Sequence, residues 1–240
     1  MSEESKLEIK KVPQIKICGI TTEQEAYYLN EADVAYAGLV FCKESKRNVT
    51  LLQAEKIIKA LDSSIRKVAV FLEPDYEILE NIHSIGVDGV QIHREFQSDK
   101  VDASFFVWKA FSIGESMGEN MGGSNADTNV IQSQKDKMLM EKLSINFSDK
   151  RIEGILFDAA KAGSGRTFPW SITEQIESIR IENKDKKIIL AGGLNEQNVQ
   201  QGIHIFYPDI VDVSSGVEGK NGLKSKEKIM EFVRKVRNYE

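Results

Sequence analysis

Cysteine and histidine are scarce in this sequence. Its 240 residues include two cysteines, Cys18 and Cys42, and three histidines. Two cysteines so far apart in the chain provide neither a disulfide framework nor the closely spaced ligands of a zinc site. We therefore expect a protein of a reducing compartment that holds no metal ion.

Long apolar runs and an excess of positive charge are missing as well. No run approaches the roughly 20 apolar residues that cross a bilayer, and the N-terminal stretch MSEESKLEIKKV is charged where a signal peptide is apolar. The net charge of −5 offers no basic surface for nucleic acid or for anionic lipids. These absences predict a cytoplasmic protein that binds neither nucleic acid nor a membrane.

Strand-type and helix-type segments alternate along the whole chain. Eight short runs are dense in Val, Ile, Leu and Phe, which is typical of parallel strands covered by helices. They are residues 14–18, 35–41, 67–72, 88–93, 105–111, 153–158, 187–191 and 209–214. With up to eight helices between them, they predict an α/β fold, a single-domain (β/α)8 TIM barrel of about the usual 250 residues. A doubly wound open sheet stays possible, because alternation does not fix closure.

Helix boundaries are marked by local signals. Three pairs have the spacing of a capping box that opens a helix, namely Thr22 with Glu25, Thr50 with Gln53, and Ser171 with Glu174. Gly86 predicts the end of another helix. One apolar helix face is predicted near the C-terminus from the spacing of Ile229, Phe232, Val233 and Val236.

Two segments fall outside the alternation. Residues 1–13 read as a charged extension, which leaves the barrel over residues 14–240. Residues 114–137 are rich in Gly, Asn, Ser and Asp and predict a flexible insertion after the fifth strand. Such a loop emerges at the face where barrel active sites lie, so it is either a solvated insertion or a lid.

Polar residues at the C-terminal ends of strands are candidate functional groups in a barrel. Cys18, Arg47, His93 and Asp158 lie at or after the ends of the first, second, fourth and sixth predicted strands. The thiol is either a packed core group or a base with a lowered pKa. The carboxylate of Asp158 either caps a loop or acts as a catalytic acid. Arg47 is either a solvated charge or a ligand for a substrate carboxylate. His93 is either a structural hydrogen-bonding residue or a catalytic one.

Glycine-rich loops follow the last three predicted strands. Their residues of interest are Gly163, Gly165, Gly192, Gly193, Ser214, Ser215 and Gly216. Barrels often bind phosphate in the loops after strands seven and eight, with backbone N–H groups and a helix N-terminus, here expected near Asn195. Either loop alone is explained by a simple turn, but two consecutive loops favour a phosphate site.

Seven of the eight predicted strands carry motifs that resemble the phosphoribosylanthranilate isomerase family. In order they are KICGIT, GLVF with SKRNVT, VQIH, WKAF, LFDA with GSGRTFPW, LAGGLNEQNV and VDVSSGVEG, over about residues 15–236. Members of that family are (β/α)8 barrels of tryptophan biosynthesis that need no metal or organic cofactor. The resemblance implies conversion of N-(5-phosphoribosyl)anthranilate to 1-(2-carboxyphenylamino)-1-deoxyribulose 5-phosphate, an Amadori rearrangement.

The resemblance also implies roles for individual residues. Cys18 matches the general base and Asp158 the general acid, so the chemistry requires a protonated carboxyl and a partly ionised thiol. Arg47 matches the arginine that meets the anthranilate carboxylate. The other implied substrate contacts are His93, Gly163, Gly165, Gly192, Gly193, Asp212, Ser214, Ser215 and Gly216. The expected partner is this phosphorylated small molecule, bound by a monomer or homodimer.

Departures from the family pattern leave the proposed acid and base untouched. Glu73 stands where asparagine is common, Arg94 where glycine is usual, and Pro169 where aspartate is typical. Two alternatives remain. A histidine-pathway sugar isomerase would have an aspartate in place of Cys18 and a phosphate site in each half of the barrel. A silent barrel that binds a phosphorylated ligand would lack the acid or the base.

Overall fold

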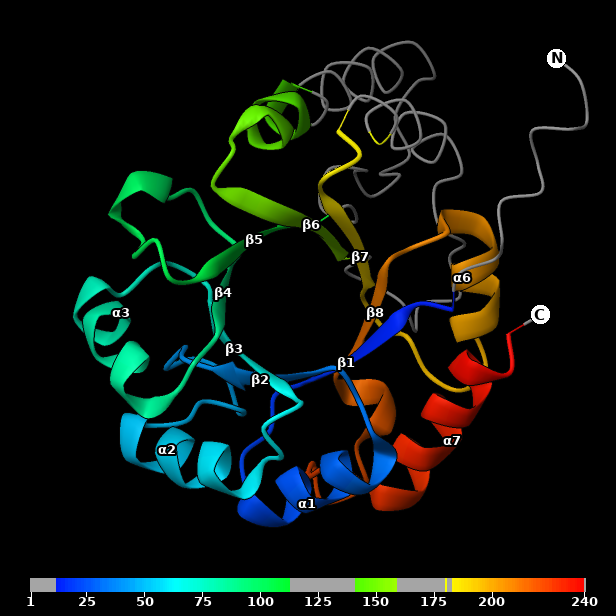
Figure 1. Cartoon of the computed structure of the whole chain (residues 1–240). Coiled ribbons are helices and arrows are strands. Elements are labelled where there is room, and N and C mark those ends of the chain that lie inside the picture. The colour runs from blue at the N-terminus through cyan, green and yellow to red at the C-terminus, as the bar shows by residue number, and fades with distance from the viewer. Residues whose placement is uncertain (1–11, 113–140, 159–179, 181–182, 240) are drawn as a thin grey trace, which may run out of the picture.

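The strands form a closed parallel barrel in chain order (Figure 1). The computed structural model describes residues 12–112, 141–158, 180 and 183–239. The strands are β1 (Gln14–Cys18), β2 (Tyr36–Val40), β3 (Arg66–Phe71), β4 (Gly89–Ile92), β5 (Phe106–Ser112), β6 (Ile152–Asp158), β7 (Lys187–Ala191) and β8 (Ile210–Val213). Because β8 pairs with β1, the open sheet is excluded and the predicted barrel is confirmed.

Helices surround this barrel on the outside (Figure 1). They include α1 (Glu23–Ala32), α2 (Leu51–Ala60), α3 (Tyr76–Ile82), α6 (Val199–Phe206) and α7 (Lys226–Arg237), and residues 141–148 are also helical. The capping boxes at Thr22 and Thr50 are confirmed, since each side chain accepts a hydrogen bond from the backbone three residues on. The predicted cap at Ser171 and the predicted insertion over 114–137 lie outside the described residues, as does most of the 1–13 extension.

Two connections differ from the predicted pattern. Residues 93–105, which are fully described, contain a 3-10 turn at Ser98–Lys100 in place of a helix between β4 and β5. The helix after β7 begins at Val199 and not near Asn195. Asn195 and Asn198 explain the delay, because their side-chain oxygens accept bonds from nearby backbone N–H groups and stabilise a turn first.

Apolar side chains pack in two separate layers. One layer lies between the strands and the helices and includes the predicted α7 face, all four residues of which are buried. The other fills the interior of the barrel with Tyr36, Phe106 and Trp108 among its members. Gly89 makes room for this packing, since a Cβ there would lie 2.3 Å from the Phe106 ring. The described part of the chain contains no helix long and apolar enough to cross a membrane.

Candidate active site

A cavity of about 370 Å³ opens at the C-terminal end of the strands. It brings together nine of the residues singled out in the sequence, namely Cys18, Arg47, His93, Asp158, Gly192, Gly193, Asp212, Ser214 and Ser215. Gly216 follows directly in the loop after β8, and Gly163 and Gly165 lie outside the described residues. Residues from six strands or the loops after them therefore converge on one hollow.

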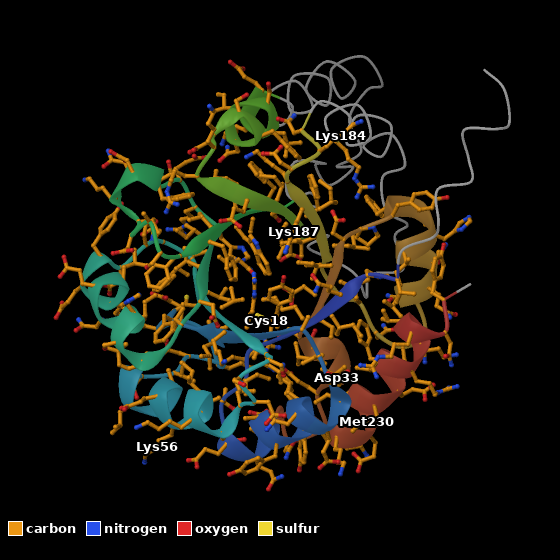
Figure 2. The ribbon with its side chains drawn as sticks, in the orientation of Figure 1. Cys18, Asp33, Lys56, Lys184, Lys187 and Met230 are labelled. Atoms are coloured by element: carbon orange, nitrogen blue, oxygen red, sulfur yellow. The ribbon has the colours of Figure 1, made fainter. Side chains whose placement is uncertain are left out.

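Cys18 is the last residue of β1 and lies inside the ring of strands, close to β2 (Figure 2). The next residue, Gly19, has φ +79°, a left-handed conformation that favours glycine and turns the chain away. The carbonyl oxygen of Cys18 accepts a 3.0 Å hydrogen bond from Ser214 Oγ. This bond fixes the end of β1 to the loop after β8, with the half-buried thiol at the cavity.

The thiol of Cys18 is surrounded by opposing charges. Burial raises the pKa of Cys18 above 9.0, the charge of Lys16 opposes that rise, Asp212 adds to it, and Lys224 opposes it more weakly. Burial outweighs the two lysines, so the lowered pKa expected from the sequence is not found in the free protein. The thiol is therefore largely protonated at neutral pH before a ligand binds.

Asp158 ends β6, which lies across the ring from β1 and β2 (Figure 1). Its backbone pairs with Ser112 of β5 and Ala191 of β7. Because residues two apart on a strand share a face, Asp158 faces inward like Leu156, and both line the cavity. The carboxyl group and the Cys18 thiol thus approach the cavity from opposite walls.

Arg47 is held by a carboxylate that sequence reasoning missed. Its Nε donates a 2.5 Å hydrogen bond to Glu218 Oε1, and Lys46 and Lys224 lie 3.0 and 3.2 Å from the same carboxylate. Burial would raise the pKa of Glu218, but hydrogen bonds from Arg47 and Lys46 and the nearby charges lower it to about 2. The bond at Nε orients the guanidinium, whose two terminal amino groups are suited to a ligand carboxylate.

His93 presents a neutral imidazole to the cavity. Burial, together with the charges of Lys16 and Lys109, lowers the pKa of His93 from 6.5 to about 4. The amide nitrogen of Gln91 lies 3.0 Å from its Nε2. At neutral pH this side chain can therefore exchange hydrogen bonds with a ligand but adds no charge.

The loops after β7 and β8 are in direct contact. Gly192 and Gly193 have φ values of +91° and +57°, which favour glycine. At Gly216 a Cβ would lie 1.9 Å from the carbonyl oxygen of Leu194, so a side chain does not fit there. Glycine thus lets two loops pack at the edge of the cavity. Among the described residues, no group of three or more His, Cys, Asp or Glu could hold a metal ion.

Comparisons with known proteins agree with this architecture. A family model described as N-(5'phosphoribosyl)anthranilate (PRA) isomerase matches residues 15–235. The N-(5'-phosphoribosyl)anthranilate isomerases of Clostridium kluyveri and Clostridium acetobutylicum are 36% and 35% identical to the chain, and each match covers 94% of this chain and 98% of the relative.

Solved structures point the same way. The phosphoribosyl anthranilate isomerase of Thermotoga maritima superposes with a TM-score of 0.72 at 26% identity, over 94% of this chain and 98% of the other. A second structure, of the same enzyme type in complex with reduced 1-(o-carboxyphenylamino)-1-deoxyribulose 5-phosphate, gives a TM-score of 0.70 at 26% identity over the same shares. The chain belongs to the N-(5'-phosphoribosyl)anthranilate isomerase family, a family of isomerases of tryptophan biosynthesis.

Proposed function

We propose that Cys18 and Asp158 act as base and acid in the isomerisation of N-(5'-phosphoribosyl)anthranilate at this cavity. The observation that carries the proposal is that the two groups face one cavity from opposite walls. A histidine-pathway isomerase would have an aspartate at position 18, where this chain has Cys18. A silent barrel would lack the base or the acid, and this chain has both Cys18 and Asp158. Both alternatives are therefore disfavoured.

The two residues divide the proton transfers between them. Asp158 protonates the ring oxygen of the ribose, the bond from C1 to that oxygen breaks, and the lone pair of the amine forms a protonated Schiff base. The thiolate form of Cys18, which is the minor form in the free protein, then removes the proton from C2, and this gives an enolamine and the neutral thiol. Tautomerisation moves a proton to C1 and leaves the ketone at C2, so atoms and charge balance. Each transfer by a placed group contributes about 10²–10⁴ in rate.

The remaining residues of the cavity bind the two anionic ends of the substrate. Arg47 takes the anthranilate carboxylate by a bidentate pair. The phosphate is bound by the loops after β7 and β8, with backbone N–H groups at Gly192, Gly193, Ser215 and Gly216 as donors. Gly163 and Gly165, which follow β6 in the sequence, are further substrate contacts in this proposal. Asp212, Ser214 and the neutral His93 contact the sugar. The phosphorylated relative complex described above has both kinds of anionic group in its ligand's name.

Oligomeric state and location complete the proposal. We expect a cytoplasmic monomer or homodimer, and one relative of known structure is described as a dimeric enzyme from which monomers were generated. Light scattering on the purified protein distinguishes the two states.

A direct isomerase assay on Cys18→Ser and Asp158→Asn tests the assignment. Each variant should lose at least about 100-fold in kcat while it still binds the reduced product analogue. Cys42→Ser, at the other cysteine of the cavity wall, is the matched control and should keep nearly full turnover. Near-normal kcat in Cys18→Ser or Asp158→Asn would rule out the role given to that residue.

A further inference from the structure

Beneath the cavity lies a fully buried lysine that the proposed chemistry leaves unused. We propose that Lys16 is a positioning residue of the reaction, whose ammonium group stabilises the thiolate of Cys18 and orients Asp212. The proposal rests on the role of Cys18 as the base. It assigns to Lys16 no contact with the substrate.

Lys16 lies inside the barrel on the same face of β1 as Cys18. The two are separated by one residue, so their side chains point the same way. On β8, Asp212 is the register partner of Lys16, and its Oδ2 lies 2.9 Å from Lys16 Nζ. The side chain of Lys16 is 0% exposed, and a lysine is almost never so buried unless it is paired. Its apolar neighbours do not explain a charge in this position.

Gly38 places the ammonium group and the thiol beside each other. This residue of β2 is the register partner of Cys18. A Cβ built on it would lie 2.9 Å from Cys18 Sγ and 3.1 Å from Lys16 Nζ. The sulfur and the nitrogen therefore border the same small space, which any side chain at this position would fill. With glycine there, the positive charge acts on the sulfur through a water-poor interior, where charges interact strongly.

Among the charged and titratable groups around Cys18, Lys16 stabilises the thiolate most. Three of them lie on strands, namely Lys16 on β1, Asp158 on β6 and Asp212 on β8. The other three follow strands, namely Arg47 after β2, His93 after β4 and Lys224 after β8. Among the charges acting on Cys18, that of Lys16 is the largest one opposing burial, ahead of Lys224. His93 is neutral at pH 7, because its pKa is about 4.

The groups around Lys16 favour its charged form. Burial alone would lower the pKa of Lys16, but the charge of Asp212, together with the neighbouring Cys18, outweighs burial and raises the pKa above 10.5. The same ion pair uses one oxygen of Asp212. The other oxygen, Oδ1, is buried and has no hydrogen-bond partner among the described residues, while Asp212 lines the cavity. Lys16 thus fixes this carboxylate through one oxygen and leaves the other unpaired at the wall of the cavity.

The pH dependence of alkylation tests the link between Lys16 and Cys18. In a Cys42→Ser parent, the rate of reaction with iodoacetamide from about pH 6 to pH 11 reports the thiolate fraction of Cys18 alone. In Lys16→Met the midpoint should rise by about one unit or more, because an opposite charge has been removed. In a plot of kcat/KM against pH, the rise on the acidic side should shift to higher pH by the same amount. The activity of Lys16→Met should therefore recover at high pH.

A matched control separates charge from burial. Lys186 is also buried, but its Nζ donates to the carbonyl oxygens of Asp149 and Ile152. In Lys186→Met the alkylation midpoint should equal that of the parent. A shift below about half a unit in Lys16→Met, or an equal shift in both variants, would overturn the proposal.

Two further measurements keep the outcome decisive. If Lys16→Met does not fold, the double variant Lys16→Met/Asp212→Asn removes both buried charges and should still show a raised midpoint, since Lys16 has the larger effect on Cys18. Retained turnover in Cys18→Ser would disprove Cys18 as the base, yet the alkylation shift would still be measurable. Failure of the proposed function is thereby distinguished from failure of this inference.

Discussion

The two ends of the barrel interior differ in how they are filled. At the N-terminal end, Tyr36 packs edge-on against Trp108 with ring centroids 5.0 Å apart, and Phe106 lies 4.9 Å from Trp108. Lys187 Nζ donates a 3.0 Å hydrogen bond to the hydroxyl of Tyr36, which in turn donates to Gln14. At the C-terminal end the same strands present a thiol, carboxylates and small residues around a cavity.

This difference assigns stability to one end and chemistry to the other. Aromatic rings bury large areas and stabilise the closed end. At the open end, the buried Asp212 and the half-buried Cys18 are polar groups next to a cavity. Such an arrangement contributes little to folding and is retained where it serves a ligand. Substitutions at the two ends should therefore affect different measurements, and each prediction below can break that separation.

Removal of the largest ring at the closed end should have the largest effect on stability. Trp108 is 1% exposed, and Trp108→Ala leaves a cavity among Tyr36, Phe106 and Gly154. We expect the free energy of unfolding to fall by about 3–5 kcal/mol, measured by urea denaturation. Below the melting transition, kcat should stay within about tenfold of wild type. A loss of activity without a loss of stability would contradict the division between the ends.

Loss of the carboxylate under Arg47 should have an intermediate effect on both measurements. Glu218→Gln weakens the ion pairs to Lys46, Arg47 and the buried Lys224, so we expect about 1–3 kcal/mol of destabilisation at pH 7. KM should rise more than kcat falls, because Arg47 loses its orientation.

The pH dependence of stability checks the cause of this effect. Since the pKa of Glu218 is lowered from 4.5 to about 2, its contribution is complete above pH 4.5 and is lost as the pH falls through about 2. The difference between wild type and Glu218→Gln should shrink over the same range in urea unfolding experiments. A difference that stays constant down to about pH 2 would show that the carboxylate charge is not responsible.

The sequence predicted local features well and the interior of the barrel poorly. All eight strands were predicted within one residue at either end, because buried parallel strands are dense in apolar residues and each cap is encoded within four positions. In QIKIC, however, alternation alone suggests that Lys16 faces water. Closure of the barrel reverses this assignment, because Ile15 and Ile17 pack against helices while Lys16 and Cys18 face the interior.

Contacts between loops that are distant in the chain were not predicted either, because they too depend on how the barrel closes. Glu218 and Arg47 are far apart in the chain, and their ion pair depends on how two loops fold over the end of the barrel. Glu73 and Arg94 were separate departures from the family pattern, yet they form an ion pair with each other at the end of β3 and β4. No local signal predicts either pair.

The smallest predicted effect is that of the ion pair between Glu73 and Arg94. Both side chains are mostly exposed, 62% and 58%, so water and salt screen their attraction. They lie beside His93 in a shallow surface depression, outside the cavity that holds Cys18 and Asp158. In Glu73→Gln, Arg94→Gln and the double variant, the melting temperature should change by less than about 2 °C, and KM by less than about twofold. A larger, non-additive rise in KM would extend the functional end of the barrel to this rim, and the boundary between the two regions would have to be redrawn there.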